Sequence, residues 1–455
     1  MADSTTRILL QDIEDHPDLA DIDAYIAQGG YKTLEKTLKE MKPEKVMEVV
    51  KEANVKGRGG AGFPAGAKWG MCADRYPRYI LANADESEPG SFKDRKLLEG
   101  NPHRVIEGMI LASYSLGINL GYIYMRGEFF HIYDQVEKCL IQAREKGYLG
   151  DNILGRDFSL ELYPHPGAGA YICGEETGLI ESLEGNRPYP RLKPPFFPAA
   201  VGLWEQPTIL NNVETFSDVT LILQNGAEWF LNLGTEDTSG TRLIGVSGHV
   251  KNPGLYELNP GITLREVIYD VAGGVRDDNK LKAVIPGGIS APVLTPDEID
   301  TTMELGVLGS IGTMGGTGGV IVMDETVSII DVMLNASNFA RHESCGQCTP
   351  CREGTPWMND ILRRIHDGEG RIEDIELLLD ICVQIHGRTV CPFGMAPAVW
   401  PIRTFLVKYY PEIRASIEQK KAVVLPVEEA YLKQDEGFDA LGGPGNFRLK
   451  EQVLV

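Results

Sequence analysis

The stretch YILANADESEPG (residues 79–90) joins a short apolar segment to a loop of acidic residues and glycine. Its apolar start, residues 79–82, predicts a buried β-strand, and the glycine and proline that follow predict a loop. A helical pattern then covers residues 102–116. This order of strand, loop and helix is the unit from which a parallel sheet is built.

The same alternation occurs twice more along the chain. Strands are predicted at 122–125 and 158–163, and helices at 132–146 and 175–183. Ligands of parallel sheets bind at the carboxyl ends of the strands. The loops at those ends should therefore form the site, and they are rich in glycine and acidic residues: 83–90, 126–128 and 167–176.

The predicted fold class is α/β, with several domains in sequence. Residues 1–55 form a helical segment, and 56–239 form the parallel-sheet domain. A small β-grasp-like domain is expected at 240–325, and a helical bundle at 326–424. Residues 425–455 offer few core positions, so we expect this extension to lie on a partner or to be disordered.

The amino-acid composition argues against several classes of function. The 455-residue chain carries a net charge of −21, from 65 acidic and 44 basic residues, which argues against binding to a nucleic-acid backbone. No apolar stretch approaches the roughly 20 residues of a membrane helix, so no direct membrane insertion is expected. The amino terminus shows no secretory signal, and the free thiols suit a reducing cytoplasm.

A cysteine run, SCGQCTPC (residues 344–351), is the most specific motif. Its spacing directs the thiolates of Cys345, Cys348 and Cys351 to one point, as in a [4Fe–4S] cluster that takes a fourth cysteine from elsewhere. Structural zinc is the alternative, but it usually takes two separate C-x-x-C pairs. The spacing therefore favours an electron-transfer protein.

The fourth ligand is either Cys382 or Cys391. Cys382 lies on the apolar face of a predicted helix, where cysteine packs as a small apolar side chain. Cys391 follows a loop and precedes Pro392, so it has no packing role, and we predict that it is the ligand. The remaining cysteines are expected to be free thiols: Cys72, Cys139, Cys173 and Cys382.

A glycine-rich loop, GRGGAGFPAG (residues 57–66), predicts a nucleotide cradle. It contains G-x-G-x-x-G, but a helix precedes it and Pro64 interrupts it, so it is not a Rossmann turn. Closely spaced glycines still let backbone N–H groups approach a phosphate, and Arg58 and Lys68 add positive charge. A flexible surface loop is the alternative.

Two acidic residues, Glu175 and Glu176, begin a predicted helix. Capping of that helix would explain them. Alternatively, a carboxylate beside a ribose accepts its hydroxyl groups and repels a 2′-phosphate, so Glu88 and Glu176 could favour NADH over NADPH. Three histidines show no metal-ligand spacing: His165, His342 and His386.

Six ordered motifs carry a resemblance to a known family. They are GRGGAGFPAGAKW (57–69), NADESEPGSFKDR (83–95), GAGAYICGEETGLI (167–180), RLKPPF (191–196), NNVET (211–215) and ESCGQCTPCREG (343–354). Over residues 30–420 the chain resembles the NADH-binding, flavin-carrying F subunits of respiratory complex I. Phe393 and Met395 replace the Leu and Asp that the family often shows after the fourth cysteine.

The resemblance implies FMN near the glycine loop, with NADH stacked over its ring. Residues implied to surround FMN are Gly57, Arg58, Gly59, Gly60, Lys68, Asn83, Asp85, Glu86, Tyr171, Gly174, Glu175, Asn211, Asn212 and Thr215. It implies contacts to NADH from Phe63, Glu88, Glu176 and Phe196, with Lys68 shared. Hydride transfer to FMN needs orientation, by Glu88 and Glu176, rather than an acid or base.

The resemblance also implies one [4Fe–4S] cluster on Cys345, Cys348, Cys351 and Cys391. A single cluster implies partner subunits that carry electrons towards quinone: a small [2Fe–2S] subunit and a large multi-cluster subunit, on the cytoplasmic side of the inner membrane. Two other functions stay open. One is the diaphorase subunit of a NAD-linked hydrogenase or formate dehydrogenase, and the other is a non-catalytic nucleotide-binding scaffold with structural zinc.

Overall fold

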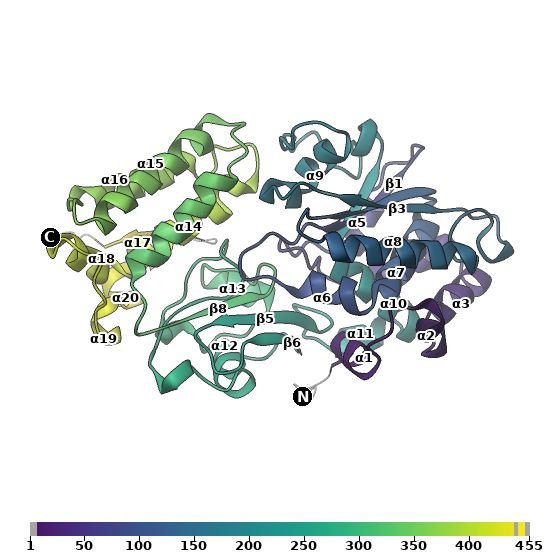
Figure 1. Ribbon diagram of the computed structural model, residues 1–455, viewed down its shortest axis with the longest axis horizontal. Coiled ribbons are helices and arrows are strands. Elements are labelled where there is room, and N and C mark those ends of the chain that lie inside the picture. Colours follow the sequence, from purple (N-terminus) through teal and green to yellow (C-terminus); the bar gives the residue numbers. More distant parts are fainter. Residues whose placement is uncertain (1–6, 441–444, 451–455) are drawn as a thin grey trace. The chain divides into compact units, whose positions relative to one another are not determined.

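The computed structural model describes residues 7–440 and 445–450. The chain divides into two compact units. The first comprises the described residues up to Ser87, Phe92–Leu243 and Tyr256–Pro260, and the second comprises Glu88–Ser91, Ile244–Leu255 and the described residues from Gly261 onward. Figure 1 shows the elements of both units along the chain.

A four-stranded parallel sheet forms the centre of the first unit. Its strands are β1 (Tyr79–Ala84), β2 (Leu120–Met125), β3 (Glu161–Pro166) and β4 (Thr208–Asn212), in the order β3-β2-β1-β4. The predicted parallel α/β fold is therefore confirmed. The sequence pattern did not reveal β4, which pairs with β1 along its whole length.

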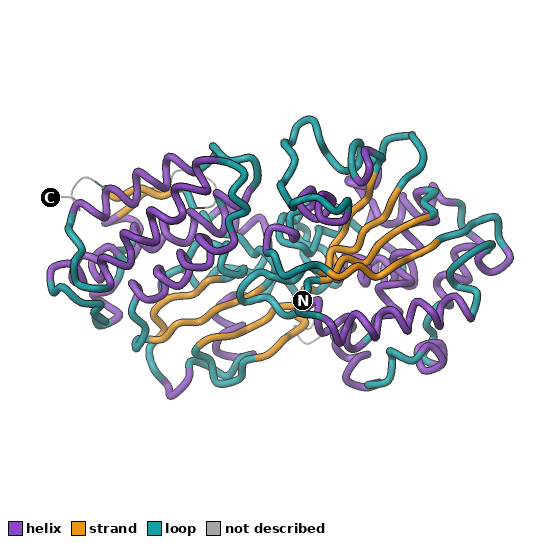
Figure 2. The backbone as a smooth tube through the Cα atoms, turned by 45° about the horizontal axis from the view of Figure 1, so that its top comes forward, coloured by secondary structure: helices purple, strands orange, loops and turns teal. Residues whose placement is uncertain are grey.

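Helices cover both faces of this sheet (Figures 1 and 2). On one face α7 (Pro102–Leu116) packs against α10 (Val213–Asn225). The two helices approach so closely that a Cβ on Gly108 would lie 2.0 Å from the carbonyl oxygen of Phe216. On the other face α9 (Glu176–Leu183) buries Leu179 and Ile180 against side chains of β1, β2 and β4.

The remaining helices of the first unit surround this core. The helical prediction for residues 1–55 is confirmed from Leu9 onward. The α-helices are α1 (Leu9–Asp15), α2 (Ile22–Ala27), α3 (Lys32–Glu40), α4 (Pro43–Glu52), α5 (Ala65–Gly70), α6 (Lys93–Gly100), α8 (Phe130–Glu145) and α11 (Ala227–Asn232). Short 3-10 turns are η1 (Ile153–Gly155), η2 (Tyr171–Gly174) and η3 (Leu203–Glu205).

A second four-stranded sheet has the order β6-β5-β8-β7. In it β8 is parallel to β5 and antiparallel to β7. The predicted small β-rich domain is confirmed, although β7 was not foreseen. Its elements are β5 (Arg242–Gly248), β6 (Gly254–Leu258), α12 (Leu264–Glu266), η4 (Val267–Val271), η5 (Arg276–Asp278), β7 (Leu281–Ile285), η6 (Pro296–Glu298), α13 (Leu305–Ser310) and β8 (Gly319–Asp324).

A helical bundle follows, as predicted. Its members are α14 (Ile329–Glu343), α15 (Thr349–His366), α16 (Glu373–Ile385), the 3-10 turn η7 (Pro392–Gly394), α17 (Ala396–Lys408) and α18 (Tyr410–Glu418). Consecutive helices from α14 to α17 contact one another and are joined by short connections, so they run antiparallel. The α14–α15 and α16–α17 connections therefore lie at the same end of the bundle.

The residues after Val424 correct the expectation of a disordered or partner-bound tail. Helices α19 (Val427–Ala430) and α20 (Gln434–Gly437) lead into the hairpin of β9 (Phe438–Ala440) and β10 (Phe447–Leu449). Phe438 and Phe447 are 1% exposed, and the Lys408 ammonium lies 5.7 and 4.9 Å from their ring centres. The described part of the tail thus packs on the chain's own α17, and residues 441–444 and 451–455 lie outside the described residues.

No helix in the described part of the chain is long and apolar enough to cross a membrane.

Candidate functional site

The loops after β1 and β3 meet at the carboxyl edge of the first sheet. Asn83, near the end of β1, donates from Nδ2 to the carbonyl oxygen of Gly174 (2.9 Å) and accepts from the Asp85 N–H (3.0 Å). Its register partner on β4 is Asn212. Four residues predicted to contact the flavin thus gather at one edge, because parallel strands end on the same side.

The glycine loop lies against the same edge. Gly57 donates its N–H to the carbonyl oxygen of Phe63 (2.9 Å), and Arg58 donates its N–H to Oγ1 of Thr215 (3.0 Å). A Cβ on Gly59 would lie 3.4 Å from the Cβ of Asn212. Gly60 has φ +117°, which a side chain would oppose. The loop therefore presents a close backbone surface of the kind that approaches a phosphate.

The side chain of Arg58 has a different role from the one expected. Its guanidinium is 1% exposed and lies 3.0 Å from Asp218 Oδ2 and 3.8 Å from Glu214 Oε1. It also donates to the carbonyl oxygens of Ser239 (2.9 Å) and Thr241 (3.0 Å). Its charge therefore anchors the loop to α10.

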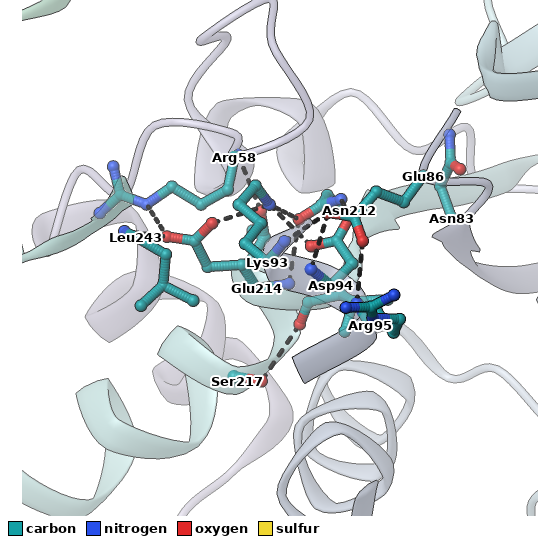
Figure 3. Close-up of polar contacts among 12 residues, drawn as sticks. Arg58, Asn83, Glu86, Lys93, Asp94, Arg95, Asn212, Glu214, Ser217 and Leu243 are labelled. Carbon is teal, nitrogen blue, oxygen red and sulfur yellow. Dashed lines mark hydrogen bonds and ion pairs between the residues drawn. The ribbon is translucent and has the colours of Figure 1, made fainter. Parts of the chain in front are cut away.

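A buried lysine, Lys93, pairs with the same Glu214 carboxylate at this edge (Figure 3). The Lys93 ammonium lies 2.7 Å from Asp94, 2.8 Å from Glu214 and 3.1 Å from Oδ1 of Asn212. Nδ2 of Asn212 donates to Asp94 (2.6 Å). Burial lowers the pKa of Lys93, but the carboxylates of Asp94, Glu214 and Glu86 raise it above its ordinary value. Lys93 is therefore charged, and it orients Asn212.

Sequence reasoning missed Lys93, Asp94 and Glu214. All three lie inside motifs that carried the resemblance, where charged residues stand next to predicted site residues. That proximity was the only signal available, because the ion pair between Lys93 and Glu214 joins residues more than a hundred positions apart.

Glu86 acts as a helix cap. Its carboxylate is 6% exposed and accepts the N–H groups of Lys93 (2.7 Å), Asp94 (2.8 Å) and Arg95 (3.0 Å) at the start of α6. Its carbonyl oxygen accepts from Nη1 of Arg126 (2.7 Å). The side chain and the backbone of Glu86 thereby both hold the loop after β1 in place.

Two lysines surround the acidic pair at the start of α9. Glu175 caps the helix by accepting from the Thr177 and Gly178 N–H groups (2.8 and 2.9 Å), so the capping role is confirmed. Lys193 contacts Glu175 (2.7 Å) and Glu176 (2.9 Å), and Lys68 lies 3.4 Å from Glu176. Burial raises the pKa of Glu176, but the two lysines outweigh it and lower that pKa. Lys193 was not foreseen as a site residue.

Aromatic side chains flank these charges. Phe63, on the glycine loop, is 45% exposed, and Phe196, three residues after Lys193, is 42% exposed. Exposed rings offer faces for stacking a planar ligand. Tyr171 lies in η2, directly before α9. Asn211 is buried and accepts from the Trp69 indole (2.9 Å), so it braces β4 against α5.

Glu88 belongs to the second unit, in the short segment Glu88–Ser91. Its carboxylate accepts from the N–H (2.7 Å) and the hydroxyl (2.9 Å) of Ser290. Both contacts hold the carboxylate in one orientation.

The cysteines of the motif stand at the helix junctions of one bundle end. Cys345 follows α14, Cys348 precedes the first residue of α15, Cys351 lies in its first turn, and Cys391 precedes η7. By contrast Cys382 is fully buried in α16, with its sulfur 3.7 Å from Sδ of Met358. The predicted apolar packing of Cys382 is confirmed.

This thiol set fits an iron–sulfur cluster. Within residues 7–440 and 445–450, no three His, Cys, Asp or Glu side chains lie close enough together to hold a single metal ion. A cubane is larger than an ion, so its four thiolates are spread more widely. Four cysteines at one bundle end are a donor set that such a cluster takes.

Family models match three successive parts of the chain. Residues 50–221 match the Nuo51 FMN-binding domain, 242–322 the SLBB domain, and 331–416 the NADH-ubiquinone oxidoreductase-F iron-sulfur binding region.

Curated relatives match almost end to end. The NADH-quinone oxidoreductase F 2 subunit of Rhizobium meliloti is 45% identical over 416 residues, covering 91% of this chain and 98% of the relative. The F subunit of Aquifex aeolicus is 45% identical, with 94% and 97% covered, and that of Escherichia coli is 44% identical, with 88% and 90% covered. The chain belongs to the family of NADH-quinone oxidoreductase F subunits.

A solved structure has the same fold as this F subunit. It is a NAD+-reducing [NiFe]-hydrogenase in the H2-reduced state, with a TM-score of 0.78 and 32% identity, covering 92% of this chain and 68% of the hydrogenase chain. The expected resemblance to the F subunits of complex I is thus confirmed.

Proposed function

We propose that this chain is the electron-input subunit of an NADH-quinone oxidoreductase, which oxidises NADH with FMN and passes electrons to a [4Fe–4S] cluster. The observation that carries the proposal is 45% identity to an F subunit over 91% of the chain, together with cysteines at one bundle end and a glycine loop at the sheet edge. The scaffold with structural zinc does not explain the identity, and the single C-x-x-C-x-x-C run differs from the two separate C-x-x-C pairs that structural zinc usually takes.

The flavin would lie at the carboxyl edge of the first sheet. The backbone of Gly57–Gly60 would approach its phosphate, and Asn83, Asp85 and Glu86 would line the opposite side. The other proposed contacts come from Lys68, Tyr171, Gly174, Glu175, Asn211, Asn212 and Thr215. Support comes from the hydrogen bonds that hold these loops together at one edge.

NADH would bind beside the flavin through exposed aromatic rings and an ionised carboxylate. Phe63 and Phe196 would stack with it, and Lys68, Glu88 and Glu176 would orient it. Because Lys68 and Lys193 keep Glu176 ionised, this carboxylate can accept ribose hydroxyl groups and repel a 2′-phosphate. The lysines also prevent the acidic edge from repelling the pyrophosphate.

When bound, FMN accepts a hydride from NADH and releases electrons singly, and the cluster conducts them onward. The protein's part in this step is orientation, because hydride transfer needs stacked rings rather than an acid or base. Lys93 and Arg58 contribute by holding Asn212 and the glycine loop in place. Cys345, Cys348, Cys351 and Cys391 are the proposed cluster ligands.

The chain acts in a complex with partner subunits. We assign it a small [2Fe–2S] subunit and a large multi-cluster subunit, because one cluster alone does not reach quinone. Association with the cytoplasmic side of the inner membrane would follow through these partners. The five-part division at residues 55, 239, 325 and 424 remains part of the proposal.

A diaphorase subunit of a NAD-linked hydrogenase is the second candidate, favoured by the solved structure with a TM-score of 0.78. The higher identity to the F subunits, 45% against 32%, ranks it second. Subunits that co-purify with the natural protein distinguish the two.

Anaerobic titration with NADH, followed by visible spectroscopy, tests the proposal. The flavin bands should bleach in proportion to the NADH added, and NADPH should bleach them far less at the same concentration. A bound flavin that does not respond to NADH would exclude NADH oxidation, and zinc in place of iron would exclude the electron-transfer role.

A further inference from the structure

A polar cavity of about 300 Å³ lies among the helices of the first unit, apart from the cofactor residues. Its lining comes from α1, from the segment around α2 and α3, and from α7, α10 and α11. None of the residues proposed to bind FMN or NADH is among those that line it. The cavity is therefore a separate feature of the unit.

Three buried donors in the lining have no acceptor within the described chain. They are Nδ2 of Asn101 and the Nε and Nη1 atoms of Arg104. Asn101 is 3% exposed, and the Arg104 side chain is 12% exposed. A buried donor without an acceptor costs about 1–3 kcal/mol, so three together indicate an acceptor that a bound molecule supplies.

The two carboxylates in the same lining already have donors within the chain. Glu107 accepts from the Tyr25 hydroxyl (2.6 Å) and from the N–H groups of Tyr31 (3.0 Å) and Leu34 (3.0 Å). The carboxylate of Asp12 forms an ion pair with Nη2 of Arg104. The buried lining atoms without a partner in the described chain, at Asn101 and Arg104, are donors, which favours an anionic ligand.

The lining contains the carboxylates of Asp12 and Glu107 besides the Arg104 guanidinium, and a further positive contribution comes from the start of α7. Asn101 is the N-cap of the 15-residue helix α7, where its Oδ1 accepts from the Arg104 N–H (3.2 Å). The first turn of α7 contains no acidic residue. The positive end of the helix dipole therefore adds to the charge of Arg104 beside the cavity.

We propose that this cavity is a binding site for a small oxyanion, a phosphate or a short carboxylate, held by Asn101 and Arg104. Such an anion supplies the missing acceptors at both side chains at once. It would also bridge α1 to α7, because Arg104 already contacts Asp12 of α1. Binding should therefore stabilise the amino-terminal helices.

Calorimetric titration of the FMN-saturated, full-length protein tests the site. Inorganic phosphate and malonate are titrated separately into protein in chloride buffer of equal ionic strength, so that saturated FMN sites do not contribute. We expect saturable binding of at least one anion and a higher melting temperature in its presence. Saturable binding of phosphate alone would identify the ligand as a phosphate group. Saturable binding of malonate alone would identify it as a carboxylate.

The variant Asn101→Asp gives the decisive comparison. Aspartate retains the cap oxygen, so α7 should still form, but it replaces the donor with a negatively charged oxygen. We expect affinity to fall at least about tenfold, because a charge-assisted hydrogen bond becomes a repulsion. Asn101→Ser retains a neutral cap and should weaken binding by about threefold.

The matched control is Asn152→Asp, which adds the same charge at an exposed turn outside the cavity and should bind like the parent. The proposal is overturned if the parent binds neither anion saturably. It is equally overturned if Asn101→Asp and Asn101→Ser, checked for folding by circular dichroism, bind as tightly as the parent.

Discussion

The two redox regions of this chain are built in opposite ways. At the sheet end, where β1 and β4 finish, loops from distant parts of the sequence are joined by buried ion pairs, with Lys93 and Arg58 enclosed among carboxylates. At the bundle end, where α14 to α17 are connected, three of the four proposed ligands lie within seven residues. The first region depends on long-range electrostatics, and the second on local spacing.

The difference shows what each cofactor requires of the protein. Thiolates bind iron directly, so short segments between helices are sufficient to present them. A flavin and a nicotinamide are held by many weak contacts. The protein loops that bind them therefore need to be fixed by surrounding residues, here by buried ion pairs. A single substitution at the bundle end should therefore affect only the cluster. A single substitution at the sheet end should affect both the stability of the unit and the binding of its cofactors.

The largest expected effect is at the bundle end. Cys391→Ala should abolish the [4Fe–4S] signal or convert the cluster, because one of four thiolates is lost. The measurements are iron content and electron paramagnetic resonance of the reduced protein. Cys382→Ala is the control. It should retain the cluster and lose only roughly 1 kcal/mol of stability, because it truncates a packed side chain. Loss of the cluster in Cys382→Ala but not in Cys391→Ala would make Cys382 the ligand instead of Cys391.

A second experiment tests the support of the sheet end. Lys93→Met leaves Asp94 and Glu214 buried without their common cation, and we expect a loss of about 3–5 kcal/mol, measured by urea denaturation. FMN retention should fall with it, because Asn212 loses its orientation. Lys96→Met, on the exposed side of the same helix, should change stability by less than about 0.5 kcal/mol. Equal effects of the two substitutions would contradict the support role.

Acid should weaken the helices that adjoin the sheet. His103 is fully buried between the Tyr31 hydroxyl (3.0 Å) and Gln142 (3.2 Å), and burial lowers its pKa to about 4. Between pH 6.5 and 4 the unfolded chain binds a proton that the folded chain does not. The stability from neutral His103 is therefore complete above pH 6.5 and lost as pH falls towards 4, by about 3 kcal/mol.

Urea denaturation at several pH values, compared with His103→Gln, measures this loss. The variant should lose less stability over the same interval, because glutamine does not titrate. His131→Gln is the control at an exposed position and should follow the parent. Parallel curves for the parent and His103→Gln would show that His103 does not carry the acid sensitivity.

The smallest expected effect concerns coenzyme choice. Glu176→Ala removes the carboxylate that Lys68 and Lys193 keep ionised, so the ratio of NADPH to NADH activity should rise by about tenfold or less. Steady-state rates with ferricyanide as acceptor measure this ratio. Glu181→Ala, on the same helix but paired with Arg191, should leave it unchanged. An unaltered ratio in Glu176→Ala would remove its discriminating role.

The sequence by itself determined the features that depend on local pattern. Alternating apolar runs predicted the parallel sheet, and α7 begins and ends at the predicted residues. Cys345, Cys348, Cys351 and Cys391 stay the predicted cluster ligands, whereas the burial of Cys382, predicted from helical periodicity, is confirmed. Each predicted helix and strand, and the 345–351 cysteine turn, is encoded within about twenty residues, because secondary structure and turn ligands are local.

Only the tertiary structure decided the rest. It showed that Arg58 faces carboxylates instead of a phosphate, that Lys93 and Lys193 complete the charge pairs, and that the tail after residue 425 packs on α17. These contacts join residues of different structural elements, and no local pattern encodes which charges meet. Burial then fixes their partners, because an ion removed from water must find its counter-ion within the fold.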